Sequence, residues 1–216
     1  NALQLIVGGD GLHKTHLFIL LFFAILIMSS CGYFEYPRAY EFREPLMITS
    51  AGQSPGALQL TVIANTMELD YTFDKLLNSD CLNSSSYNTL IFVVGVSAKG
   101  LGAANISLDD EIKRVRRLAI EAKSAGKSVI VCNIEGASRR GPSSDLVVNT
   151  LSPYSDAYFV RSDANQDGFF TNLSEKYKVP LELFEKNIDI RDILIKFFGD
   201  AGYLMNLLAP NLIARH

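Results

Sequence analysis

Two apolar runs, Thr89-Leu-Ile-Phe-Val-Val94 and Ser128-Val-Ile-Val-Cys-Asn-Ile134, enclose the segment that decides the fold. Each run is almost continuously apolar, which is typical of a strand covered on both faces of a parallel sheet. The chain between them predicts a helix over residues 108–125, because apolar residues recur there at steps of four and three. These residues are Leu108, Ile112, Val115, Ala119 and Ala122. Strand, helix and strand in this order predict one right-handed β-α-β unit.

The ends of this helix carry their own signals. Ser107 suits the N-cap, Asp110 three residues later completes an approximate capping box, and Gly126 suits the position after the last turn. We expect the basic residues of the helix to form a solvated face. They are Lys113, Arg114, Arg116 and Arg117.

The same alternation extends outward in both directions along the chain. Strands are predicted at residues 46–50, 71–73, 157–160 and 180–185. Helices are predicted at 57–67 and 188–198, and two more are predicted between them, one that begins near Pro142 and one that includes 173–177. In the helix at 57–67 we expect Leu58, Val62 and Met67 to form the apolar face, and we expect residues 95–106 to form a glycine-rich loop. Alternation of this kind predicts an α/β fold: a three-layer α/β/α sandwich with a mostly parallel sheet, Rossmann-like or flavodoxin-like.

Composition excludes several classes of protein. The chain has 216 residues, of which 48% are hydrophobic and 20% charged, so it is neither disordered nor collagen-like. The net charge of -3 argues against nucleic acid as a partner. Its three histidines, His13, His16 and His216, all lie outside residues 44–199. A Ser-His-Asp triad, a Cys-His pair or a histidine-ligated metal is therefore not expected in the folded part.

An uncharged run of twelve residues, Leu17–Met28, precedes Ser29-Ser-Cys31. The run is too short to cross a bilayer, which takes about 20 residues, and it matches the apolar core of a secretory signal. Small residues before Cys31 resemble the lipobox of bacterial lipoproteins, although Met28 departs from that pattern. We therefore expect an exported protein of the cell envelope, held to the membrane by a lipid on Cys31. The alternatives are an ordinary signal peptide that is cut nearby and an anchor that is not cleaved.

This interpretation divides the chain into four parts. They are a signal segment at 1–31, a tether at 32–44, an α/β domain at 45–199 and an apolar tail or extra helix at 200–216. The domain contains Cys81 and Cys132, and the sequence leaves open whether they form a disulfide.

Polar and glycine residues concentrate in the loops that follow the predicted strands. In open parallel sheets, ligands bind outside the carboxyl ends of the strands. The candidate ligand-binding residues are Ser50, Gly52, Gln53, Ser54, Ser97, Lys99, Gly100, Gly102, Glu135, Arg139, Arg140 and Asp145. Lys99 and the two arginines suggest a pocket for a small anionic molecule, beside a helix N-terminus. Alternatively, the glycines only make turns and the arginines pair with Glu135, Asp145 or Asp163.

The segment from Asp163 to Phe170 resembles the start of an EF-hand calcium loop. Asp163, Asn165 and Asp167 provide oxygen atoms at positions one, three and five, with Gly168 at position six. Position twelve is Ser174 instead of the usual Glu. Calcium is the only cofactor the sequence suggests; alternatively, these residues cap the following helix and make turns.

Four motifs in order resemble a family of exported bacterial α/β domains of unknown function. They are Thr49-Ser-Ala-Gly-Gln-Ser54, Val93-Val-Gly-Val-Ser-Ala-Lys-Gly-Leu-Gly-Ala-Ala104, Arg139-Arg-Gly-x-x-Ser-Asp145 and Asp163-x-Asn-x-Asp-Gly-Phe-Phe170. The resemblance spans Pro45 to Phe198 and implies export and a Rossmann-like fold, without a known activity.

We therefore expect a tethered domain that binds a small anion. One alternative is a histidine-independent hydrolase or transferase, with Asp145 or Glu135 as the base and with Lys99, Arg139 and Arg140 stabilising charge. The other is an envelope protein-interaction module that uses its apolar tail.

Overall fold

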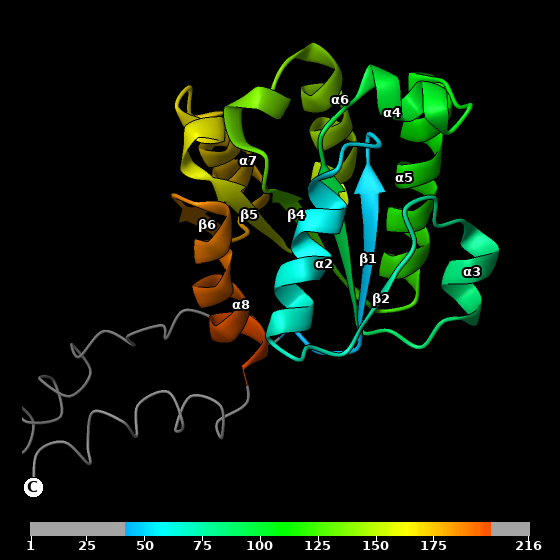
Figure 1. Cartoon of the computed structure of the whole chain (residues 1–216), viewed down its shortest axis with the longest axis horizontal. Helices are drawn as coiled ribbons and strands as arrows, with labels where there is room; N and C mark the ends of the chain where they lie inside the picture. The colour runs from blue at the N-terminus through cyan, green and yellow to red at the C-terminus, as the bar shows by residue number, and fades with distance from the viewer. Residues whose placement is uncertain (1–41, 200–216) are drawn as a thin grey trace, which may run out of the picture. The chain divides into compact units, whose positions relative to one another are not determined.

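The sheet has six strands, and every pairing between neighbouring strands is parallel. The computed structural model describes residues 42–199 (Figure 1). The strands are β1 (Leu46–Ala51), β2 (Tyr71–Phe73), β3 (Thr89–Val94), β4 (Ser128–Asn133), β5 (Ala157–Arg161) and β6 (Leu181–Phe184). Their order is β2-β1-β3-β4-β5-β6, which is the flavodoxin-like order with a sixth strand added. The prediction of an α/β fold with a mostly parallel sheet is confirmed.

Seven α-helices connect or follow these strands within the described residues. They are α2 (Gly56–Thr66), α3 (Ser79–Ser84), α4 (Ala98–Ala103), α5 (Leu108–Ser124), α6 (Pro142–Leu151), α7 (Phe169–Tyr177) and α8 (Ile190–Phe198). Short 3-10 turns occur at η1 (Gly136–Arg139), η2 (Ser152–Tyr154), η3 (Ser162–Asn165) and η4 (Asn187–Asp189). Helices α2 and α8 cover one face of the sheet, and α5, α6 and α7 cover the other (Figure 1).

The central strands are buried on both faces, as their apolar sequences predict. All six residues of β1 and all six of β3 are buried. On one face, Phe92 of β3 and Tyr158 of β5 pack with Val115, Val147 and Phe170 from the covering helices. Burying side chains of this size stabilises a fold by roughly 1.5–3 kcal/mol each.

Helix α5 has the predicted position and caps. The Ser107 side chain accepts a hydrogen bond from the Asp110 amide, the Asp110 carboxylate accepts one from the Ser107 amide, and Gly126 adopts a φ of 70°. Within the predicted stripe, Val115, Ala119 and Ala122 are buried, and the two residues of its first turns pack against the core more loosely.

Two predictions about local structure were wrong. The predicted loop at 95–106 contains helix α4. Helix α3, capped by Asn78, lies where the sequence predicted no element. In α2, Leu58 and Val62 are 59% and 60% exposed, so they do not form the buried face. The buried side of α2 is instead provided by smaller residues and by Leu60 and Ile63.

The folded domain begins before Pro45. Phe42, from the predicted tether, is buried, with its ring centroid 5.3 Å from Phe197 and 6.4 Å from Phe159. The predicted signal segment, Cys31, most of the tether and the tail at 200–216 lie outside the described residues. Among residues 42–199, no helix is long and apolar enough to span a membrane.

Candidate functional site

The loops after β1 and β3 meet at the carboxyl edge of the sheet, between the two strands where the strand order reverses. The Ser54 amide donates to the Gly95 carbonyl at 3.1 Å, and the Ser97 amide donates to the Gly52 carbonyl at 2.8 Å. Gln53 and Val96 add an antiparallel bridge. In this fold type ligands bind in the crevice between these strands, but here the chain's own backbone fills it.

The glycines of these loops allow the two loops to approach each other. Gly52 has a φ of 112°, and a Cβ there would lie 2.5 Å from the Gly95 carbonyl oxygen. A Cβ on Gly100 would collide with the Gln53 carbonyl oxygen, whereas one on Gly102 would meet nothing within 4 Å. The space beside Gly52 and Gly100, two of the candidate ligand-binding residues, is therefore taken by protein backbone.

Glu111, on helix α5, anchors the loop after β1. Its side chain is fully buried, and it accepts hydrogen bonds from the Gly52 amide at 2.7 Å and from Gln53 Nε2 at 3.1 Å. Arg114 neutralises it, with Nε 2.8 Å from Glu111 Oε2. A buried charge needs such a partner, because desolvation of an isolated carboxylate is very unfavourable.

Arg114 itself is not part of a solvated face, contrary to the prediction. Its side chain is only 15% exposed, and it donates to the carbonyls of Leu77 at 2.9 Å and Ser50 at 2.5 Å. The sequence contains a signal for this arrangement that our prediction missed. Glu111 lies one turn before Val115 and two before Leu118, on the apolar side of α5, where a lone acidic residue requires a buried partner.

Glu135 and Ser54 come together at the first turn of α2. Glu135 Oε2 accepts from the Gly56 amide at 3.1 Å, and the Ser54 hydroxyl oxygen lies 3.4 Å from the same amide nitrogen. The other oxygen of Glu135 accepts from Arg139 Nε at 3.0 Å. A carboxylate at a helix N-terminus is stabilising. Ser54 is only 1% exposed, so this arrangement caps a helix and does not present a hydroxyl and a base to a substrate.

Arg140 uses all five of its N–H groups within the protein. Two donate to the Asp145 carboxylate, at 2.7 and 3.1 Å, and two to the Asp167 carboxylate, at 3.1 and 2.9 Å. The fifth donates to the Ala164 carbonyl. The guanidinium also lies 4.4 Å from the centre of the Phe169 ring. Because an arginine has five donors, none remains for an anionic ligand in this arrangement.

The ion pairs around Arg140 shift the pKa values of their members. The hydrogen bonds that Arg140 donates to Asp145 and to Asp167 raise the pKa of Arg140, and those to Asp167 lower the pKa of that carboxyl. Asp163 is paired in the same way with Arg161, at 2.8 and 2.7 Å, and these hydrogen bonds lower its pKa. All of these shifted side chains therefore stay charged at neutral pH.

The calcium-like segment is held by helix-capping and ion-pair contacts. Asn165 Oδ1 accepts from the amides of Phe170 and Thr171, at 2.8 and 3.2 Å, near the start of α7. The carboxylates of Asp163 and Asp167 face arginines. Within residues 42–199, no group of three or more acidic, histidine or cysteine side chains is arranged to hold a metal ion.

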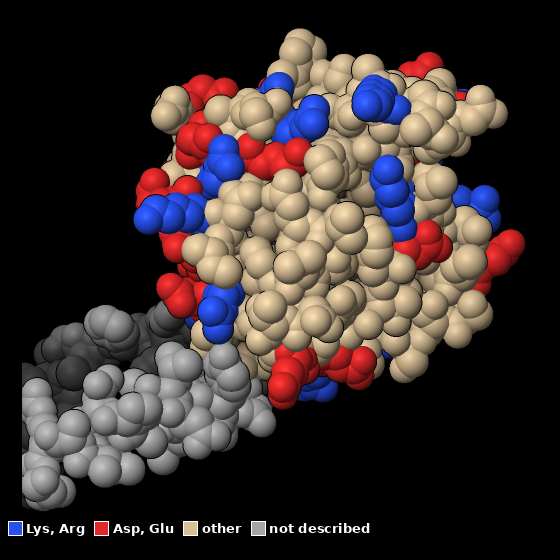
Figure 2. Space-filling view, viewed as in Figure 1, with Lys and Arg blue, Asp and Glu red and all other residues tan. Residues whose placement is uncertain are grey.

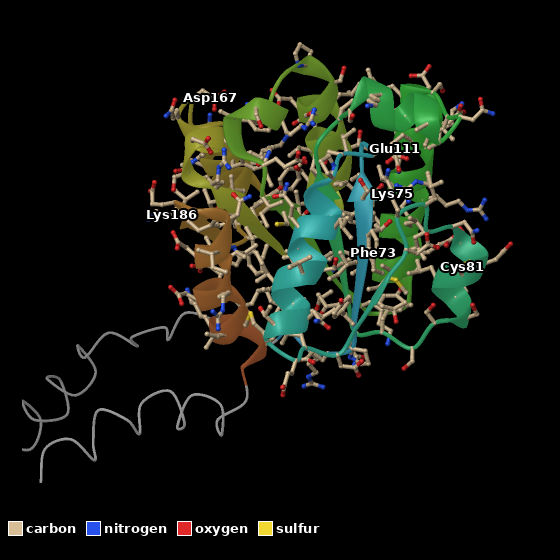
Figure 3. The ribbon with its side chains drawn as sticks, in the orientation of Figure 1. Phe73, Lys75, Cys81, Glu111, Asp167 and Lys186 are labelled. Atoms are coloured by element: carbon tan, nitrogen blue, oxygen red, sulfur yellow. The ribbon has the colours of Figure 1, made fainter. Side chains whose placement is uncertain are left out.

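A hollow of about 320 Å³ opens at the same edge, between the segments that follow β4 and β5. Its charged lining consists of three carboxylates, Asp145, Asp163 and Asp167, and one guanidinium, Arg140. Charged side chains of both signs are intermixed along this edge (Figure 2). Figure 3 shows Asp167 near one end of the edge and Glu111 far from it. Of the predicted ligand-binding residues, only Arg140 and Asp145 line this hollow.

The remaining predicted residues are distributed along this edge. Ser50, near the end of β1, and Gln53, in the loop after it, are buried. The Ser97 hydroxyl caps α4 by accepting from the Gly100 amide at 3.1 Å. Lys99 is exposed on α4 and makes no ion pair with a described residue. Cys81 is exposed and Cys132 buried, and both are free thiols; burial raises the pKa of Cys132.

The comparisons with known proteins identify a family for this chain and assign it no activity. The solved structures similar to this chain include the esterase AlinE4, described as a SGNH-hydrolase family esterase, and a serine-to-alanine mutant of it, at 13% and 14% identity. Each alignment covers 81% of this chain and 95% of the other, with a TM-score of 0.27, which carries no argument about activity. No curated protein matches the chain. The model of one family matches residues 43–198, and the chain therefore belongs to that family, the domain of unknown function DUF6305.

Proposed function

We propose that this chain is an exported, lipid-anchored domain of the bacterial envelope. We propose further that it binds a small molecule rich in hydrogen-bond donors, such as an amine, in the hollow at the carboxyl ends of β4 and β5. The proposal of export rests on the apolar run Leu17–Met28 and on Cys31 after two serines. The proposal of binding rests on the position of the hollow, because ligands of open parallel sheets occupy this edge.

One observation carries the choice of ligand. Every N–H group of Arg140 is already used, whereas the carboxylates around it are only partly used. The side chains of Asp163 and Asp167 are 38% and 60% exposed. A carboxylate has about four lone-pair sites, so both can accept further hydrogen bonds while keeping their arginines. The hollow thus offers acceptors but few donors, which favours an ammonium group over a phosphate or carboxylate.

The anionic ligand expected from the sequence is the second candidate. Its charge would come from Lys99, which makes no ion pair with a described residue, and from Arg139, whose terminal nitrogens have no described partner. Arg140 would take no direct part. The hydrolase alternative is weaker, since both of its candidate bases already accept hydrogen bonds within the protein. Glu135 accepts from the Gly56 amide and from Arg139, and Asp145 accepts from Arg140.

A thermal-shift screen separates these candidates. We expect 1,4-diaminobutane to raise the melting temperature, and phosphate and citrate to have no effect. Asp163→Asn should abolish the rise, because it removes an acceptor while leaving every Arg140 contact in place. Asp80→Asn is the matched control: it removes an exposed carboxylate on α3, on the other side of the fold (Figure 1). A rise with phosphate that Lys99→Ala removes would establish the second candidate instead.

A further inference from the structure

Helix α2 presents an apolar ridge to solvent. Leu58 and Val62 are 59% and 60% exposed, more than any other large apolar residue of the described chain. They are four residues apart, so they lie on the same side of the helix, one turn from each other. Isolated exposed apolar residues are ordinary, but adjacent ones on a single helix face indicate an interaction surface.

A third apolar side chain widens this ridge. Ile188 in η4 is 51% exposed. The neighbouring Asn187 donates through Nδ2 to Gln59 Oε1 on α2, at 2.8 Å, which places η4 directly beside the helix. The ridge surface, which we define as Leu58, Val62 and Ile188, therefore combines two segments that are more than 120 residues apart in sequence.

The part of the ridge surface that lies on α2 is also uncharged. Helix α2 contains no acidic or basic residue, whereas nine of the 17 residues of α5 are charged. Figure 2 shows a broad area without charged side chains over α2. This absence of charge limits the possible partners. Attraction to an anionic membrane surface requires lysines or arginines, and complementary charges usually guide recognition between different proteins.

We propose that the ridge surface binds the same surface of a second copy of this chain. The chain has a net charge of -3, so an uncharged face is where two copies meet without electrostatic repulsion. A two-fold axis between Leu58 and Val62 sets the two α2 helices antiparallel. Leu58 then contacts the partner's Val62, and Val62 contacts the partner's Leu58, as isologous interfaces require. One helix face is smaller than a standard interface, so the dimer is weak and dissociates readily.

Disulfide trapping between two differently substituted chains tests this geometry. The full chain is produced with Cys31→Ser and Cys81→Ser, which leaves the buried Cys132 as the only native cysteine. Leu58→Cys is then added in one preparation and Val62→Cys in another. We expect the mixture to form a covalent heterodimer under mild oxidation. The matched control mixes Leu58→Cys with Leu146→Cys, because Leu146 is 49% exposed on α6, on the opposite face of the sheet. This second mixture should yield at least ten-fold less heterodimer.

Equal trapping in the two mixtures would overturn the proposal, as would no trapping in either mixture. A second measurement guards against an effect of the cysteines on folding. Val62→Glu should shift sedimentation of the full chain in mild detergent toward monomer, and Leu146→Glu should leave it unchanged, with both variants showing wild-type circular dichroism. A wild-type chain that sediments as a monomer at every concentration would contradict the dimer. The ridge surface would then have another occupant, such as a different protein, a lipid surface or the chain's own tail.

Discussion

Glu111 and Arg114 form a buried ion pair one turn apart on α5, and the pair joins this helix to the loop after β1. Glu111 holds the amide of Gly52 while Arg114 holds the carbonyl of Ser50, so the pair binds both polar groups of the same short segment. The loop after β3 then packs against this fixed backbone. The closed crevice at the carboxyl edge is therefore a consequence of a charge pair inside the protein.

Loss of Glu111 should destabilise the whole domain. Glu111→Ala leaves Arg114 buried without its counter-charge and the Gly52 amide without an acceptor. Breaking a buried pair by removing one partner typically costs about 3–5 kcal/mol, and we expect a loss of that size in the free energy of unfolding, measured with urea. Arg116→Ala, at an exposed position on the same helix, is the control and should change stability by less than about 0.5 kcal/mol. Equal effects of the two variants would show that the pair has no special role.

The two glycines of α4 should respond to substitution in opposite ways. Gly100→Ala places a methyl group against the Gln53 carbonyl and should destabilise the domain by about 1–3 kcal/mol. Gly102→Ala meets empty space and should stabilise it by up to about 1 kcal/mol, because alanine favours helix. Thermal unfolding of both variants measures the difference. If Gly100→Ala is as stable as Gly102→Ala, the loops do not pack as described.

Stability should fall in acid, partly through Asp163. The hydrogen bonds from Arg161 lower the pKa of Asp163 in the folded state, whereas in the unfolded chain an aspartate has a pKa of about 3.9. The pair therefore contributes its stability above about pH 4, and this contribution disappears as the pH falls through the lower folded-state pKa. Since Asp163 is partly exposed, we expect less than about 1 kcal/mol. Asp163→Asn should be less stable than wild type at neutral pH and equally stable in strong acid, by urea unfolding at each pH.

The two free thiols should differ in reactivity. Cys81 is exposed, so a thiol reagent such as 5,5′-dithiobis(2-nitrobenzoate) should modify it within seconds. Cys132 is fully buried, and burial raises its pKa, so it should react only when the protein unfolds. Cys81→Ser should remove the fast phase and leave the slow one. If both Cys81 and Cys132 react in fast phases, Cys132 is not buried in β4 as described.

The sequence predicted the central strands because each is an apolar run with clear ends. The strands at 89–94 and 128–133 and the helix between them lie where their patterns placed them. The prediction of local structure failed where residues of one type occur both in loops and in helices, or both in the core and at the surface. A short helix containing two glycines, α4, is indistinguishable from a loop by periodicity, and Leu58 and Val62 are apolar residues that face solvent.

The candidate site was harder to predict because its chemistry depends on contacts between distant segments. Arg140 precedes a helix, as an anion-binding arginine does, but Asp167, 27 residues later, takes up its free donors. The one-dimensional pattern shows which residues reach the carboxyl edge of the sheet. It does not show which of them already bind one another.

The most direct test of the proposed binding hollow is to map amide chemical shifts by NMR during titration with 1,4-diaminobutane. We expect the largest shifts at Ala137, Asp163 and Asp167, around the hollow that follows β4 and β5, and no change near Lys99. The opposite result would contradict the account: the diamine would cause no shifts around the hollow, and phosphate would cause saturable shifts that cluster at Lys99 and Arg139.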